Sequence, residues 1–368
     1  MTDKGCLGRK PNRIRVGKCE GTSCLRLGKI GILIIFYVCF LSVSAWSKDT
    51  SELQTLQVFY ENDLFSGTDE YYTNAIQVTW LSSDLSQYGD DARLPKWSIP
   101  VIKAIPFSGK PNSIHNVGIL FGQQIYTPSD TQATTALEND RPYAGFLYGG
   151  LALHSKNDSK LDTMEIVLGV VGPSSKAEMA QNTVHNLRDI PTAKGWDNQL
   201  HNEPAVQLSW QRKWRLLVDR KLCGPLSYDF ISHAGLTLGN VRTSTSAGGE
   251  LRFGYNIPED FGSDVIRAGA GVSAPVIEGS KSWRTEWGTH IFVSSQIEAV
   301  AHDIFLDGNT WADSQSVDKK PLVADLSLGI SYNINMFKLT YRHLFRTKQF
   351  YNQQQGHTIG SLTLALSF

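Results

Sequence analysis

The last eight residues of the chain read SLTLALSF, residues 361–368, and alternate strictly between two kinds of side chain. One set of positions holds Leu362, Leu364, Leu366 and Phe368, and the other holds Ser361, Thr363, Ala365 and Ser367. Because successive side chains of a β-strand point to opposite faces, this spacing predicts a strand with one apolar and one polar face.

The same alternation recurs along the chain, for example in Leu322–Tyr332, Ile76–Trp80 and Ile291–Ile297. It predicts about twelve strands, near 53–62, 73–83, 115–126, 143–155, 161–171, 205–217, 226–238, 247–256, 287–301, 321–334, 336–347 and 358–368. Two-faced strands are compatible with a soluble sandwich, whose apolar face is the core, and with a membrane barrel, whose apolar face meets lipid.

Three features favour the barrel. Aromatic residues such as Trp80, Tyr126, Tyr143 and Tyr341 stand near strand ends, as interfacial girdles do. The chain begins with an export signal, described next, and stops on Phe368, which resembles the C-terminal signal read by the barrel assembly machinery. The sequence therefore predicts an all-β fold, a transmembrane antiparallel β-barrel of outer-membrane type, formed by a single domain over residues 46–368.

Residues 1–45 read as a secretory signal peptide. Eight Lys or Arg residues precede an apolar run at residues 30–43, and Val43-Ser44-Ala45 provides the small residues of a cleavage site. The leader holds eight basic and two acidic residues, so removing it from a chain with 35 of each leaves 27 basic and 33 acidic residues, a net charge of −6. An acidic body argues against nucleic-acid binding. Only Cys223 lies after the leader, so no disulfide framework is expected.

The loop between the first two predicted strands, within QVFYENDLFSGTDEYYTNAIQVTW at residues 57–80, is rich in oxygen-bearing side chains. Asn62-Asp63, Asp69-Glu70 and Thr73 lie at its ends. A tight turn favours Asn, Asp and Gly for local hydrogen bonds, whereas a calcium or hydrolytic site favours the same oxygens. The loop alone leaves both interpretations open.

With alternating connections, one end of the barrel carries the loops 63–72, 127–142, 172–204, 239–246, 302–320 and 348–357. The third of these contains SSKAEMAQNTVHNLRDI, for which we expect a short helix capped by Ser174 or Ser175, with Glu178 as the capping-box partner. Gln181 and His185 are four residues apart and share one helical face. A polar surface loop without any function has a similar composition.

Several hydrolase and nucleotide-binding signatures are absent from the sequence: there is no G-x-S-x-G, no H-E-x-x-H and no P-loop. A serine-nucleophile hydrolase is therefore not indicated. What remains is a histidine able to act as a general base, beside loop oxygens able to hold a hard cation.

Several blocks resemble the outer-membrane lipid A 3′-O-deacylase family: ENDLFSGTDEYYTNAIQVTW, QQIYTPSD, DRPYAGFLYGGLALHS, GVVGPSS, QNTVHNLRD, GWDNQLHNEP and LRFGYNIPEDFG. The resemblance implies a twelve-stranded barrel in the outer membrane of a Gram-negative bacterium, with its active site facing the outer leaflet. It also implies an esterase that removes the 3′ acyl chains of lipid A, the lipid of lipopolysaccharide, with Ca²⁺ as cofactor.

The resemblance also implies roles for particular residues. His185 would be the general base, with Gln181 as its polar neighbour. Asn62, Asp63 and Thr73 would complete the catalytic group, and Asn62 and Asp63 would hold Ca²⁺ that stabilises the oxyanion. Arg141 would bind a carboxylate or phosphate of the substrate or, equally, tie down its loop.

Two positions depart from the family pattern. Strand parity with Val58 and Tyr60 turns Asn62 outward, toward lipid, unless a bulge re-aims it. Pro191 stands where the family leads us to expect an acid.

Two alternative functions are compatible with the same barrel. One is an outer-membrane phospholipase with the same base and cation, and the other is a porin-like or adhesive barrel without chemistry. The polar faces place Gln57, Gln77, Gln123, Gln207, Gln296, Glu298 and Asp325 in the lumen, which favours a plugged interior over an open pore.

Overall fold

The computed structural model describes residues 54–63, 71–90, 94–110, 112–263, 266 and 287–368. The predicted signal peptide and the acidic pair Asp69-Glu70 lie outside these residues. The described strands are Thr55–Asn62 (β1), Tyr71–Leu81 (β2), Ile114–Thr127 (β3), Ala144–Lys156 (β4), Lys160–Val171 (β5), Glu203–Cys223 (β6), Leu226–Gly239 (β7), Arg242–Tyr255 (β8), Gly288–Asp303 (β9), Leu322–Ile334 (β10), Phe337–Arg346 (β11) and His357–Ser367 (β12).

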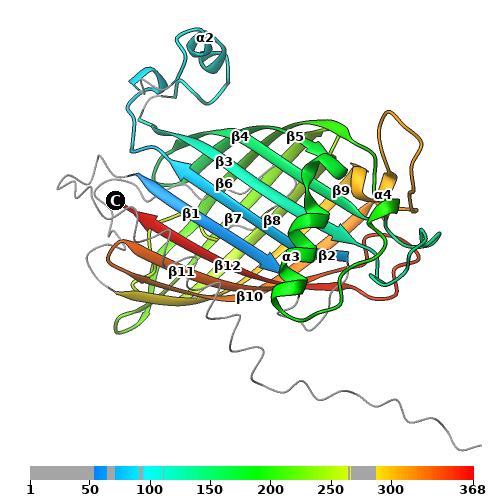
Figure 1. Cartoon of the computed structure of the whole chain (residues 1–368). Helices are drawn as coiled ribbons and strands as arrows, with labels where there is room; N and C mark the ends of the chain where they lie inside the picture. The colour runs from blue at the N-terminus through cyan, green and yellow to red at the C-terminus, as the bar shows by residue number, and fades with distance from the viewer. Residues whose placement is uncertain (1–53, 64–70, 91–93, 111, 264–265, 267–286) are drawn as a thin grey trace, which may run out of the picture. The chain divides into compact units, whose positions relative to one another are not determined.

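These twelve strands close into one antiparallel barrel (Figure 1). Each strand pairs with its neighbours in sequence, and β1 closes the barrel by pairing with β12 from Thr55↔Ser367 to Asn62↔Gly360. Beyond this register, Gln54 and Phe368 exchange two backbone hydrogen bonds of 2.9 and 3.0 Å. The predicted fold class and strand count are confirmed.

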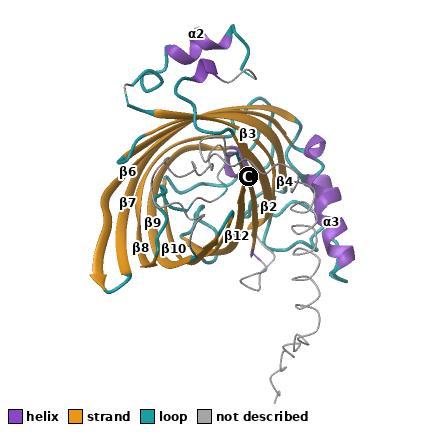
Figure 2. Cartoon of the chain, turned by 90° about the vertical axis from the view of Figure 1, so that its left-hand side faces the viewer, coloured by secondary structure: helices purple, strands orange, loops and turns teal. Residues whose placement is uncertain are grey.

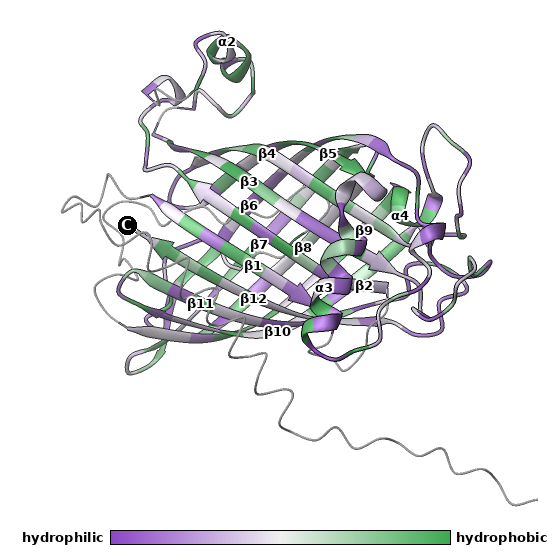
Figure 3. Ribbon diagram, viewed as in Figure 1, coloured by the Kyte–Doolittle hydropathy of each residue, from purple (hydrophilic) through white to green (hydrophobic). Residues whose placement is uncertain are grey.

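The alternation in the sequence becomes an outer and an inner face. On β2, Ile76 is 47% exposed whereas Gln77 beside it is buried, and stripes of apolar and polar residues follow the strands in Figure 3. An apolar outer belt around a polar interior is the arrangement of a barrel in lipid. No helix among the described residues is both long and apolar enough to span a bilayer.

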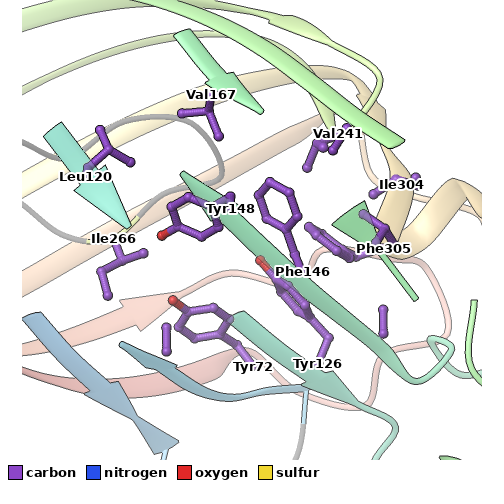
Figure 4. Packing of buried hydrophobic residues seen from close by; sticks show 14 of the residues in the cluster. Tyr72, Leu120, Tyr126, Phe146, Tyr148, Val167, Val241, Ile266, Ile304 and Phe305 are labelled. Carbon is purple, nitrogen blue, oxygen red and sulfur yellow. The ribbon is translucent and has the colours of Figure 1, made fainter. Parts of the chain in front are cut away.

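Figure 4 shows part of an apolar cluster of inward-facing side chains. The ring of Tyr126 from β3 stacks on Phe305 at a centroid distance of 3.9 Å, and Phe146 stacks on Tyr148 of the same strand β4 at 4.7 Å. Phe305 belongs to α4 (Ile304–Asp307), a short helix that follows β9. The barrel wall is therefore packed from inside at this level.

Elsewhere in the lumen, ion pairs cross between strands and loops. Arg252 pairs with Asp229 and with Asp260, and Lys338 also pairs with Asp260. Arg346 reaches Asp325 at 2.8 Å. These buried pairs satisfy charges that would otherwise be costly to bury, and they fill the interior instead of leaving it open.

Two details of the predicted organisation are wrong. The predicted loop 239–246 is instead a tight connection, because β7 ends at Gly239 and β8 begins at Arg242. The first residues of β8 are polar or small and show no apolar alternation, so the sequence did not mark the start of this strand. Gln123 does not face the lumen: it belongs to the same face as Ile119 and Phe121, which are exposed on the outside of β3.

Candidate functional site on the outer wall

The helix α3 (Ala177–Leu187) lies against the outside of the barrel, across the wall that contains β3 and β4 (Figures 1 and 2). The outward-facing Gln123 donates from Nε2 to the carbonyl oxygen of Ser175 at 2.7 Å. Below the helix, Ile125 packs with Ala177 and Trp196 in a small apolar cluster. The connection between β5 and β6, residues 172–202, thus folds back over the wall; we call this segment the cover.

A glycine permits this close approach. Gly145 on β4 pairs with the outward-facing Ile125, and a Cβ at this position would overlap the side chains of Ser175 and Ala177. Any side chain at position 145 would push the cover away from the wall.

The start of α3 differs from the prediction. Ser175 belongs to a 3₁₀ turn, Pro173–Ser175, and its hydroxyl donates to the carbonyl oxygen of Gly172 at 2.6 Å. The residue at the N-cap is Lys176, in the left-handed region at φ 60°, and no side chain caps the helix. The predicted capping box with Ser174 or Ser175 is therefore wrong, because the helix begins after Lys176 and the Ser175 hydroxyl bonds to Gly172 instead.

His185 lies on the buried face of α3, with 3% of its surface exposed. Its Nδ1 is 2.8 Å from the carbonyl oxygen of Pro191. A carbonyl oxygen only accepts hydrogen bonds, so in the neutral ring Nδ1 carries the proton and Nε2 carries the lone pair. The backbone N–H of Ile190 donates to the carbonyl oxygen of His185 at 3.0 Å and folds this turn back onto the helix.

Gln181 is buried one turn earlier on the same face, as the spacing predicts. The indole Nε1 of Trp196 donates to its Oε1 at 2.9 Å, which fixes the orientation of the amide because an indole N–H can only donate. The amide Nε2 of Gln181 is buried and has no hydrogen-bond partner among the described residues. Trp196 is held in turn by Tyr143, at 4.9 Å between ring centroids.

Asn62 ends β1 on the outward face, as strand parity predicts, yet only 2% of its surface is exposed. Tyr60 on the same face lies beside the side chain of Asn74 and within electrostatic range of Arg188 and Asp63. Arg188 directly follows α3, so the C-terminal end of the helix lies near the end of β1. Asp63, the next residue in the chain, is fully buried.

Thr73 joins the same outer face through a β-bulge. Tyr72 pairs with Tyr126 but Asn74 pairs with Ile125, so β2 contains one extra residue at Thr73. The hydroxyl of Thr73 is 2.7 Å from that of Thr127, which shares the outward parity of Ile125. The bulge thus re-aims Thr73, whereas Asn62 keeps the regular alternation.

Arg141 lies on the other side of the wall. It is fully buried beside the inward-facing Tyr126, with its guanidinium carbon 4.8 Å from the ring centroid, and its guanidinium Nη1 donates to Oε1 of Gln349 at 3.5 Å. Burial lowers the pKa of this guanidinium, against the opposing effect of Asp303. The structure therefore does not bring Arg141 together with His185.

Two cavities among the described residues lie in the lumen. One is lined by Glu61, Tyr126, Arg242 and Arg346, and another by Lys213, Glu250 and Arg342. Neither is lined by a residue of α3. The outer wall that carries α3, Asn62 and Thr73 is therefore separate from these two cavities.

The donors at the ends of β1, β2 and β3 are of the kinds that bind a hard cation. Asn62, Asp63, Thr73 and Thr127 offer only oxygen and amide groups, which Ca²⁺ prefers over the nitrogen and sulfur ligands of zinc. The described residues contain no cluster of three or more His, Cys, Asp or Glu side chains. Asp63 is the carboxylate among these four residues.

Three contributors to the site were missed from the sequence: the Pro191 carbonyl, Trp196 and Gly145. A main-chain carbonyl leaves no signal in side-chain identity. Trp196 stands in the polar block GWDNQLHNE, where an isolated large apolar residue is a sign of docking. Gly145 in a strand was a sign of close backbone approach.

Comparison with known proteins supports the same fold. A family model described as outer membrane protein LpxR matches residues 33–368. The structure of LpxR from Salmonella typhimurium superposes with a TM-score of 0.66 at 14% identity, covering 85% of this chain and 99% of that chain. No curated protein matches the chain.

Two further solved structures are barrels of autotransporters. The β-domain of Bordetella BrkA has a TM-score of 0.41 at 9% identity, covering 86% of this chain and 100% of that chain. The translocator domain of NalP from Neisseria meningitidis has a TM-score of 0.35 at 8% identity, covering 94% of this chain and 99% of that chain.

Proposed function

We propose that this chain, which belongs to the LpxR family of outer membrane proteins, is an esterase that hydrolyses the 3′ ester-linked acyl chains of lipid A. The observation that carries the proposal is the position of His185. It is a buried histidine with a fixed tautomer, on a helix that covers the outer wall of a membrane barrel.

The outward orientation of the group suits a lipid substrate. A lipid A molecule in the outer leaflet lies beside the barrel wall, not within its lumen, so its acyl esters approach from the side. Asn62 and Thr73 belong to the outward face, and α3 packs on the same face of β3 and β4. Strand parity at Asn62 therefore supports this function, although it first counted against the assignment.

The proton transfers follow from the tautomer of His185. Nδ1–H donates to the Pro191 carbonyl, which leaves Nε2 to accept a proton from water as that water attacks the ester carbonyl carbon. The resulting imidazolium then returns the proton to the sugar oxygen as the C–O bond breaks. The products are a free fatty acid and a 3′ hydroxyl group on lipid A.

Neighbouring donors would stabilise the tetrahedral intermediate. Trp196 donates to Oε1 of Gln181 and thereby fixes the orientation of the amide. The amide Nε2 can then donate to a substrate oxygen. The Thr73 hydroxyl and the Asn62 amide add further donors. Asn62 and Asp63 would hold Ca²⁺, which when bound supplies positive charge at the ester carbonyl.

The proposal is tested by mass spectrometry of lipid A from cells producing the wild-type chain or a variant. Loss of the 3′ acyl chains is expected with the wild type and with His201→Ala, a matched change of an exposed histidine in the same connection. With His185→Ala the initial rate is expected to fall by about 10²-fold or more.

Two outcomes would overturn the proposal. Full activity of correctly folded His185→Ala contradicts the mechanism. Unchanged lipid A with folded, membrane-inserted wild-type protein contradicts the substrate, and release of fatty acid from phospholipids in the same cells would then identify a phospholipase.

A further inference from the structure

The described residues of the connection between β2 and β3, 82–90, 94–110 and 112–113, pack on the outside of the barrel at the end away from α3. The hydroxyl of Tyr88 donates to the carbonyl oxygen of His154 at 2.8 Å. Tyr88 and Ile102 form an apolar cluster with Val117 of β3 and Leu153 of β4. Both strand residues share the outward parity of Ile119 and Leu151, which are exposed. The connection is thus fixed to the wall's lipid-facing side.

The helix within this connection, α2 (Ser98–Lys103), is apolar on both of its sides. Ile99 and Ile102 face the cluster. On the opposite side, Trp97 is 76% exposed and Val101 is 63% exposed. Pro100 and Ala104 are also exposed, so the exposed positions 97, 100, 101 and 104 follow helical spacing. In Figure 3 this helix is coloured as largely apolar.

An apolar face of this kind needs a cover, and the barrel indicates which one. The outer belt beside it exposes Ile119 at 48%, Phe121 at 58% and Leu151 at 45%, so the exposed face of α2 continues a surface that meets lipid. A second protein would have to compete with the bilayer for the same side of the wall.

The charges around the helix fit a lipid surface. Lys96 and Lys103 stand at its two ends and both are exposed. The carboxylate of Asp84 in the same connection is already paired with the buried Lys156 at 2.7 Å. Tryptophan with flanking lysines is typical of segments that lie at the boundary of headgroups and acyl chains, where the lysines contact phosphates.

We propose that residues 94–104 form an interfacial anchor that inserts Trp97 and Val101 into the leaflet at the barrel end opposite α3. Its ligand is a phospholipid surface with anionic headgroups, contacted by Lys96 and Lys103. The inference depends on the barrel lying in a membrane and is independent of the proposed esterase activity.

The anchor is tested by spin labelling in phospholipid vesicles of phosphatidylethanolamine and phosphatidylglycerol. Cys223→Ser removes the free cysteine of the described residues, and the other four cysteines lie in the predicted leader. In protein produced without residues 1–45, this variant provides the background for single labels at Trp97→Cys and Val101→Cys. Ile119→Cys is the lipid-exposed control, and Asp130→Cys, in an exposed loop at the other end, is the aqueous control. Collision of each label with oxygen and with a water-soluble nickel chelate is measured by power saturation.

Labels at 97 and 101 are expected to resemble the label at 119, with oxygen collisions favoured several-fold over the values at 130. Values equal to those at 130, or low collision with both reagents, would overturn the anchor because they report water or a protein cover. Lys96→Glu combined with Lys103→Glu is expected to make both labels shallower. An unchanged depth would refute the headgroup contact. Heat-modifiable gel migration verifies that every variant retains the barrel.

Discussion

At the scale of single residues, the orientation of His185 depends on a main-chain atom. Histidine bases are commonly oriented by a carboxylate, whereas the Pro191 carbonyl accepts the Nδ1 proton of the base that we propose. A carbonyl fixes the tautomer without adding a full negative charge beside the ring. The side chain at position 191 therefore matters less than the path of the backbone that presents its oxygen.

Replacement of Pro191 by Ala tests this dependence. The variant keeps the carbonyl, and loss of the proline ring changes the free energy of the turn by only about 1 kcal/mol. We expect the rate of lipid A deacylation in mixed micelles to fall by less than about tenfold, far less than for His185→Ala. A loss equal to that of His185→Ala would show that the ring of Pro191, not its carbonyl, positions the histidine.

At the scale of elements, the strands were predictable and the cover was not. Period-two alternation is a local property, so β12 and β10 could be located within one or two residues. The bulge at Thr73 left no such signal, because it depends on the pairing of Tyr72 and Asn74 with β3. The start of α3 was misassigned for the same reason: contact with Gly145 and Gln123 orients Ser175.

The glycine beneath the cover provides a matched pair of variants. Gly145→Ala forces an overlap with Ser175 and Ala177, whereas Gly149→Ala on the same face of β4 meets its nearest atoms at 3.7 Å. Overpacking of this kind costs about 1–3 kcal/mol. Tryptic cleavage within residues 172–202 is expected to accelerate about tenfold or more in Gly145→Ala, with deacylation reduced, and to stay unchanged in Gly149→Ala. Equal cleavage of both variants would contradict tight docking of the cover.

At the scale of the whole molecule, the closed barrel holds a lumen filled by side chains. Arg242 reaches Glu298 at 2.9 Å, and Arg346 reaches Asp325 at 2.8 Å. Together with the aromatic cluster around Phe305, these pairs obstruct the interior. The polar inner faces predicted a plugged lumen, but the sequence did not reveal that Arg242 and Arg346 pair with Glu298 and Asp325.

A planar-bilayer recording tests the obstruction directly. We expect no large steady ion current from the reconstituted wild-type barrel, because charged pairs and aromatic rings occupy the path that ions would take. A stable current comparable with that of a porin would favour the pore interpretation over the esterase.

The pH dependence of stability should report one of the lumen pairs. Burial raises the pKa of Asp260, but the positive charges of Lys338 and Arg252 lower it by more than burial raises it. The pKa of Asp260 therefore lies well below its ordinary value. A carboxyl with a depressed folded-state pKa stabilises the protein above the unfolded pKa of about 4, and this contribution is lost as the pH falls through the folded value.

Asp260→Asn is therefore expected to lower the free energy of unfolding by about 3–5 kcal/mol at neutral pH. The difference from wild type should shrink as the pH falls below about 4. Urea unfolding from vesicles at several pH values measures both, with Asp130→Asn as the exposed control. A difference that does not change with pH would contradict the ion-pair explanation.

The placement of His185 on the outer wall also decides how a reactant arrives. A reactant reaches the outer wall by sliding in the plane of the leaflet, so encounters are set by the number of target molecules per unit of membrane area. The concentration of substrate in the surrounding water does not affect the encounter rate. Mixing inert lipid into the same leaflet would therefore slow turnover, although the total amount of substrate in the sample is unchanged. Each released fatty acid would diffuse away laterally within the leaflet.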